Sequence, residues 1–123
     1  MIQYAAATWV KDGMDWPMVN CWGLVRYVMC CRYGRTIPRL DFDGTDKRKA
    51  TKATAYALAG MSKGAIRDGA IAVAWHGAVC YHVGIVITVN GALRILDINE
   101  GVGAATSKPA AFERQYTRVE YYA

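Results

Sequence analysis

Three closely spaced segments in the second half of the chain are rich in β-branched and aromatic residues, and they constrain the fold most. They cover residues 70–75 (AIAVAW), 80–89 (CYHVGIVITV) and 92–98 (ALRILDI). This composition is typical of strands, and the Asn90-Gly91 pair between the last two is a strong signal for a two-residue hairpin turn. The sequence therefore predicts an antiparallel sheet.

The first half of the chain shows helical spacing instead. Apolar residues recur with the helical period in residues 2–11. After a loop at residues 12–20, the same period resumes in a segment that begins at Cys21 and ends near Gly34. We expect two helices there, the second with Cys21 at its N-terminus.

A third helix and a last strand complete the expected elements. Residues 35–45 contain proline, aspartate and glycine and predict a loop. A polar helix should follow, capped by Thr45 or Asp46 and ended before Gly60 or Gly64, and residues 116–122 (YTRVEYY) should form a strand. Helices followed by an antiparallel sheet indicate the α+β class, with N-terminal helices packed on the sheet.

The length of 123 residues is that of one domain, so we predict a single domain over residues 1–123. No segment reaches the roughly 20 apolar residues that a membrane span requires, and the N-terminal residues lack the pattern of a secretory signal. We therefore expect synthesis in the cytoplasm and no membrane partner.

The chain carries 15 Lys and Arg against 10 Asp and Glu, a net charge of +5, with many cations in residues 32–52. A solvated surface, an anionic envelope polymer and nucleic acid would each be compatible with this charge. Because no nucleic-acid-binding motif accompanies it, we predict no nucleic-acid partner.

The four cysteines, Cys21, Cys30, Cys31 and Cys80, match no disulfide framework, and we expect all four to be free thiols. There is no CxxC pair, and only His76 and His82 are available as histidine ligands. The sequence therefore predicts no metal site.

Cys21 is the first candidate for chemistry because of its place at a helix N-terminus. Free backbone N–H groups and the helix dipole favour a thiolate there, and the same N–H groups can hold the oxyanion of an acyl-transfer intermediate. The alternative is that Cys21 is a small buried hydrophobe, which is the usual role of a free cysteine.

His82 is the candidate base. Strand alternation places it on the face of Gly84 and Val86, opposite Tyr81 and Val83. A histidine in an apolar strand is often only a hydrogen-bonded core residue, but a sheet packed on the Cys21 helix would bring imidazole and sulfur together.

The neighbouring strand offers a third group across the Asn90-Gly91 turn. Asp97 is an acidic residue in an otherwise apolar strand, which is unfavourable without a partner. We expect its carboxylate to orient the His82 ring, and Asn99 is the alternative; Asp97 at a strand end facing water is the other possibility.

Taken together, these segments resemble the NlpC/P60 family of cysteine peptidases. Residues 20–28 (NCWGLVRYV) resemble its nucleophile segment, Asp-Cys-(Ser or Trp)-Gly-Leu-Val, and residues 67–73 (RDGAIAV) its first strand. Residues 82–86 (HVGIV) resemble the strand that carries its catalytic histidine. Residues 97–103 (DINEGVG) resemble the segment that carries the third catalytic residue in its phage-tail branch. Two positions depart from the family pattern: Asn20 replaces an aspartate, and Asp97 replaces a histidine.

The resemblance implies a papain-like α+β fold and hydrolysis of peptide bonds in peptidoglycan stem peptides, next to D-glutamate and diaminopimelate. It implies Cys21, His82 and Asp97 as the catalytic residues and no cofactor. It also implies a phage or prophage tail protein that reaches the cell wall or periplasm within a particle, with other tail or secretion-machine proteins as partners.

Several alternatives remain open at this point. The setting could instead be that of a secreted effector or of a cytoplasmic enzyme of wall recycling. The chemistry could be that of a CHAP-like amidase, and a catalytically silent structural or adaptor protein could keep the same fold.

Overall fold

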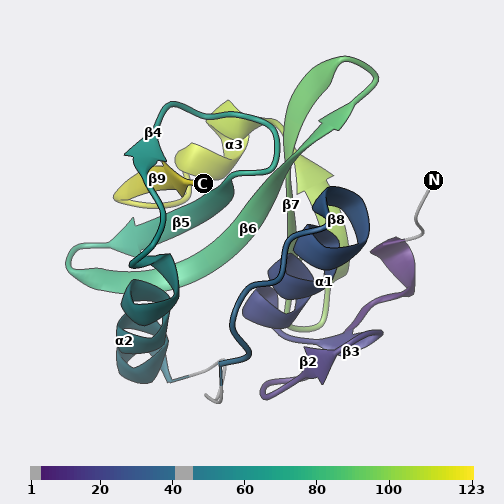
Figure 1. Ribbon diagram of the computed structural model, residues 1–123, viewed down its shortest axis with the longest axis horizontal. Helices are drawn as coiled ribbons and strands as arrows, with labels where there is room; N and C mark the ends of the chain where they lie inside the picture. Colours follow the sequence, from purple (N-terminus) through teal and green to yellow (C-terminus); the bar gives the residue numbers. More distant parts are fainter. Residues whose placement is uncertain (1–3, 41–45) are drawn as a thin grey trace.

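The computed structural model describes residues 4–40 and 46–123 and places a six-stranded sheet between helices on its two faces (Figure 1). The elements follow one another along the chain as η1 (Tyr4–Ala6), β1 (Thr8–Trp9), β2 (Met14–Asp15), β3 (Met18–Val19), α1 (Cys21–Tyr33), α2 (Lys47–Leu58), β4 (Lys63–Gly64), β5 (Ile71–His76), β6 (Val79–Val89), β7 (Ala92–Asn99), β8 (Gly103–Ser107), α3 (Pro109–Glu113) and β9 (Arg118–Tyr122).

The main sheet has the strand order β4-β9-β5-β6-β7-β8, and every neighbouring pair in it is antiparallel. The predicted antiparallel sheet and the α+β class are thus confirmed. The turn between β6 and β7 is the expected one, since Asn90 and Gly91 both have positive φ, at 52° and 79°.

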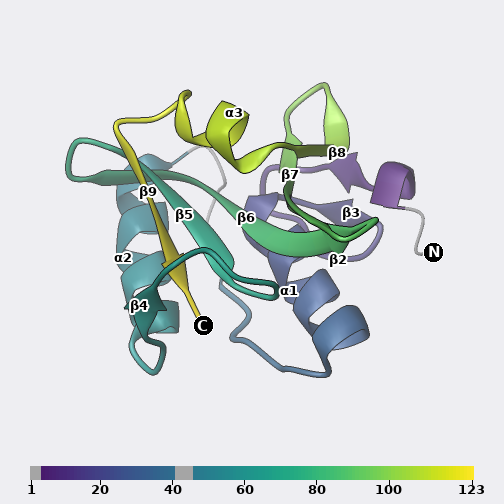
Figure 2. The same ribbon diagram turned by 90° about the horizontal axis from the view of Figure 1, so that it is seen from above.

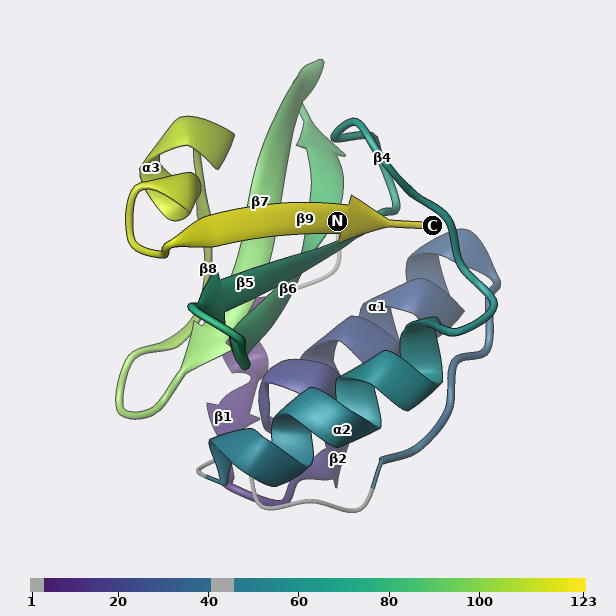
Figure 3. The same cartoon turned by 90° about the vertical axis from the view of Figure 1, so that its left-hand side faces the viewer.

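Helices α1 and α2 lie side by side on one face of the sheet, and α3 covers the other face (Figures 2 and 3). The larger core fills the space between α1, α2 and the sheet, and it includes Trp22, Leu24 and Val28 of α1 together with Ile85 and Leu96 of the sheet. Because both faces are covered, β6 is apolar on both sides, as is usual for a strand buried between two layers.

The smaller core lies between the sheet and α3. Phe112 of α3 is fully buried there against Val86 and Ile95 and against small side chains of β5, namely Ala72 and Ala74. Alternation along β6 thus sends Val86 toward α3 and Ile85 toward α1, as the strand period requires.

Helix α1 has well-defined ends. Gly34 follows it in the left-handed conformation, with φ of 64°, and its N–H is bonded to the carbonyls of Met29 and Cys30, so the predicted end near Gly34 is confirmed. Helix α2 begins after Asp46, whose carboxylate accepts the N–H of Lys49. The other cap candidate, Thr45, lies outside the described residues.

The helix predicted for residues 2–11 is wrong in its described part. A single 3-10 turn is followed by β1, which pairs in parallel with β3. Thr8 N–H is bonded to Pro17 O and Val10 N–H to Val19 O, at 2.7 and 3.1 Å. Backbone hydrogen bonds to the segment predicted as a loop therefore outweigh a weak helical preference. That segment itself contributes β2 and β3.

Other boundaries differ by smaller amounts. The last strand begins at Arg118 instead of residue 116, whereas the predicted end of α2 before Gly60 is confirmed, since the helix ends at Leu58. Strand β8 and helix α3 lie in residues 103–113, for which the sequence pattern predicted no element. Residues 35–40 form neither helix nor strand, as expected, while residues 41–45 lie outside the described residues.

Gly84 brings β6 and β7 close together on the face that carries His82. A Cβ there would lie 2.9 Å from Leu96 O, 3.0 Å from Ile95 Cγ2 and 3.3 Å from Asp97 Cβ. The missing side chain thus leaves room for Asp97 beside the strand.

We expect Gly84→Ala to lower the free energy of unfolding by about 1–3 kcal/mol, because a methyl group must displace backbone. Urea unfolding followed by circular dichroism measures the change. Gly60→Ala is the matched control, since a Cβ at Gly60 meets nothing within 4 Å. Equal stability of Gly84→Ala and wild type would contradict this packing of β6 against β7.

Candidate active site

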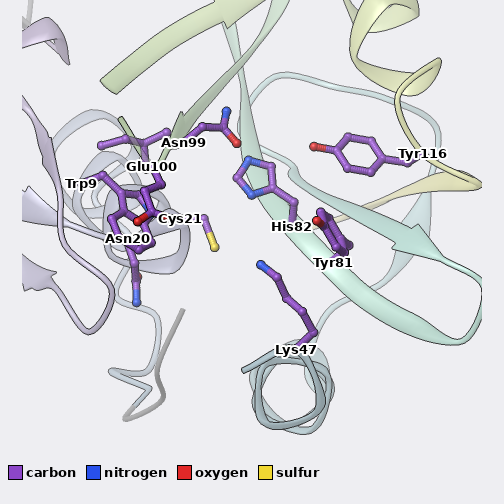
Figure 4. Close-up of a pocket in the computed structure, with 10 residues that line it drawn as sticks. Trp9, Asn20, Cys21, Lys47, Tyr81, His82, Asn99, Glu100 and Tyr116 are labelled. Atoms are coloured by element: carbon purple, nitrogen blue, oxygen red, sulfur yellow. The ribbon is translucent and has the colours of Figure 1, made fainter. Parts of the chain in front are cut away.

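A cleft of about 240 Å³ opens where the N-terminus of α1 approaches β6 and the end of β7 (Figure 4). Both Cys21 and His82 line it. The full lining comprises Trp9, Asn20, Cys21, Lys47, Tyr81, His82, Ile98, Asn99, Glu100 and Tyr116.

Cys21 is the first residue of α1, as predicted, and Asn20 places it there. The Asn20 side chain is fully buried; its Oδ1 accepts the N–H of Gly23 at 2.9 Å and its Nδ2 donates to Lys11 O at 3.1 Å. An aspartate could accept from Gly23 but could not donate to Lys11. Asparagine therefore suits this helix start, although the family that the sequence resembles commonly has aspartate there.

The helix start also supplies electrostatic support. The backbone N–H of Cys21 belongs to the first turn of α1, where the helix itself provides no acceptor. The partial positive charge of the helix N-terminus favours an anion at the sulfur or at an oxygen bound next to it.

His82 and Asp97 meet across the β6–β7 pair. His82 Nε2 lies 2.9 Å from Asp97 Oδ2, and both side chains are largely buried, at 8% and 14% exposure. Asn99 Nδ2 donates to the same Asp97 oxygen at 3.3 Å. Of the two candidates for the third group, Asp97 contacts the imidazole directly. Asn99 instead donates a hydrogen bond to the Asp97 carboxylate.

The thiol of Cys21 and the imidazole of His82 line the same cleft, and each affects the pKa of the other. Because Nε2 faces Asp97, Nδ1 is the ring nitrogen left for the sulfur. The structure therefore brings Cys21 of α1 and His82 of β6 to one cleft, with Asp97 of β7 bonded to the imidazole.

The surroundings of Cys21 and His82 shift both pKa values in directions that favour a thiolate–imidazolium pair. Burial disfavours ionisation of Cys21, but the interaction with His82 and the charges of His82 and Lys47 outweigh it and lower the pKa of the thiol. Burial likewise disfavours the imidazolium, but hydrogen bonds to Asp97 and Cys21 raise the pKa of His82 to about 9. A depressed cysteine pKa is the usual mark of a reactive thiol.

Aromatic side chains fix the imidazole from the α3 side. Tyr116 is stacked on His82, with ring centroids 6.3 Å apart and planes at 19°, and Phe112 lies at the same distance. Burial, together with the charge of Asp97, raises the pKa of Tyr116 to about 12, so its hydroxyl stays protonated. The sequence assigned Tyr116 only to a strand.

A β-bulge shapes the outer wall of the cleft. Ala74 pairs with His82 and Trp75 with Cys80, so Tyr81 is the extra residue. As a result Cys80 belongs to the larger core, while Tyr81 lines the cleft at 45% exposure. Sequence reasoning missed Tyr81, Lys47 and Trp9 as cleft residues, and the period-two pattern carries no signal for a bulge.

We expect Cys21 to react with iodoacetamide at mildly acidic pH at least about tenfold faster than the exposed Cys30, because only Cys21 has its thiolate stabilised by His82. The buried Cys80 should react least, since burial raises its pKa to about 11. Peptide mass spectrometry gives each rate as a function of pH.

His82→Ala serves as the control for this measurement. It should shift the midpoint of Cys21 alkylation to higher pH, because the imidazolium lowers the thiol pKa, and it should leave Cys30 unchanged. Identical pH profiles for Cys21 and Cys30 in the wild type would contradict thiol activation.

Within residues 4–40 and 46–123, no helix combines the length and apolar character that crossing a membrane requires. The same residues include no group of three His, Cys, Asp or Glu side chains placed to hold a metal ion. Comparison with models of known protein families finds no match for this chain, and a search of the curated proteins finds none either.

Proposed function

We propose that this protein is a cysteine peptidase that hydrolyses peptide bonds in the stem peptides of bacterial peptidoglycan. The observation that carries the proposal is one cleft lined by Cys21, at a helix N-terminus, and by His82, whose imidazole is bonded to Asp97. A nucleophile, a base and a group that orients the base are the parts that acyl transfer through a covalent intermediate requires.

In the proposed reaction, the Cys21 thiolate attacks the carbonyl carbon of the scissile amide. The resulting oxyanion is stabilised by N–H groups at the start of α1. The C–N bond then breaks, and His82 donates its proton to the leaving amine, which leaves a thioester on Cys21. Water attacks the thioester, with His82 as base, and releases the carboxylate and the free thiol.

The substrate class rests on the resemblance of residues 20–28, 67–73, 82–86 and 97–103 to the NlpC/P60 family. The α+β architecture supports that assignment, and we propose a papain-like fold of the NlpC/P60 type. A place in a phage or prophage tail, with delivery to the cell wall or periplasm, is part of the same proposal.

Digestion of defined muropeptides, followed by mass spectrometry, tests the function. We expect cleavage within the stem peptide by the wild type and none by Cys21→Ala. Cleavage only at the amide next to the sugar would identify a CHAP-like amidase instead. If the wild type leaves every muropeptide intact, the protein is better explained as an adaptor that keeps the fold without the reaction.

A further inference from the structure

Lys47 is a cleft residue that the proposed reaction does not use. It is the first residue of α2 and lines two spaces, the open cleft and a narrow recess beside Cys21, Thr54 and Cys80. Figure 4 shows its ammonium extending from α2 toward Cys21 and His82. A cation in the first turn opposes the helix dipole, so this position does not serve the stability of α2.

The bulge residue Tyr81 holds the Lys47 side chain in place. Lys47 Nζ lies 4.7 Å from the centroid of the Tyr81 ring, and that ring in turn meets the His76 ring edge-on at 4.6 Å. Contact with the face of an aromatic ring is a favourable position for an ammonium group. The ammonium thus lies against Tyr81 in the cleft that Cys21 also lines.

The charges around the cleft are arranged asymmetrically. Apart from His82, the charged side chains that line it among the described residues are Lys47 on α2 and Glu100 just after β7. A ligand carboxylate is therefore attracted to the Lys47 side and repelled from the Glu100 side. An anionic group next to the bond under attack would fix the orientation of the substrate.

We propose that Lys47, positioned by Tyr81, binds a free carboxylate on the substrate residue adjacent to the scissile bond. For the substrate, this inference rests on the proposed function: the enzyme should prefer stem peptides with D-glutamate at that residue over those with its amide, D-isoglutamine. The rival role for Lys47 is to stabilise the thiolate only, since its charge also acts on Cys21.

Alkylation of Cys21 tests the carboxylate subsite without any peptidase activity. Iodoacetate carries a carboxylate and iodoacetamide does not, but both react with the thiolate form of Cys21. A change in the thiol pKa therefore alters both rates equally and leaves the ratio of the two rates unchanged. We expect Lys47→Met to lower the iodoacetate-to-iodoacetamide ratio at Cys21 about fivefold. Lys52→Met, which removes the same charge from an exposed position of α2, should leave it unchanged.

A pair of stem peptides that differ only in D-glutamate or D-isoglutamine tests the substrate preference. We expect a several-fold preference of wild type for the carboxylate peptide in kcat/KM, retained in Lys52→Met and lost in Lys47→Met. An unchanged alkylation ratio in Lys47→Met, or an equal loss of kcat/KM for both peptides, would overturn the proposal. If neither peptide is cleaved by wild type but the ratio still depends on Lys47, the subsite stands and the peptidase function fails.

Discussion

Replacement of Cys21 by serine is expected to lower kcat for stem-peptide hydrolysis at least about a thousandfold and to leave the fold unchanged. A hydroxyl is far harder to ionise than a thiol, and the pair with His82 that lowers the pKa of Cys21 would not bring serine near ionisation at neutral pH. The exchange alters little volume. Product formation measured by chromatography and a circular dichroism spectrum of the variant give the two readouts.

Cys30→Ser is the matched control, because Cys30 lies on the exposed side of α1 and does not line the cleft. It should hydrolyse the same substrate at the wild-type rate. If Cys21→Ser keeps more than a tenth of wild-type activity, a different nucleophile performs the reaction and the proposed mechanism fails.

The part of the site that could be predicted from sequence is the part fixed by local rules. Strand alternation placed His82 on the face of Val86, and the Asn90-Gly91 turn set β7 beside β6 so that Asp97 reaches the imidazole. The helical period starting at Cys21 gave the correct N-terminus of α1. Each of these depends on neighbours a few residues away or on a two-residue turn.

The missed residues depend on contacts between distant segments. Lys47 reaches the cleft only because α2 packs on β6, and Tyr116 reaches His82 only because α3 turns the chain back over the sheet. Trp9 lines the cleft because β1 pairs with β3 rather than continuing a helix. No local pattern encodes these placements.

The contacts of Asn20 and Asp97 also explain why these two residues suit the site, although the family that the sequence resembles has other residues at both positions. Asn20 satisfies both a donor and an acceptor that an aspartate could not satisfy together. Asp97 supplies a full negative charge to the imidazole, where a histidine would supply only a hydrogen bond. Asp97 therefore has a larger electrostatic effect on His82 than a histidine at that position would have.

Asp97→Ala is therefore expected to lower kcat about a hundredfold or more, because the imidazole loses both its orientation and its charge partner. Asn99→Ala, which removes a group bonded to Asp97 but not to His82, should cost much less. A larger loss in Asn99→Ala than in Asp97→Ala would transfer the orienting role to Asn99. Steady-state kinetics on one defined muropeptide compares the two variants.

The pH dependence distinguishes a charge effect from a loss of packing. The reactive pair, thiolate with imidazolium, exists above the lowered pKa of Cys21 and below the pKa of His82, which Asp97 helps to raise to about 9. Removing the carboxylate lowers the His82 pKa, so the basic limb of the kcat/KM profile should move to lower pH in Asp97→Asn, which keeps the shape of the side chain. An Asp97→Asn enzyme that loses rate with an unshifted basic limb would show that Asp97 acts by packing alone.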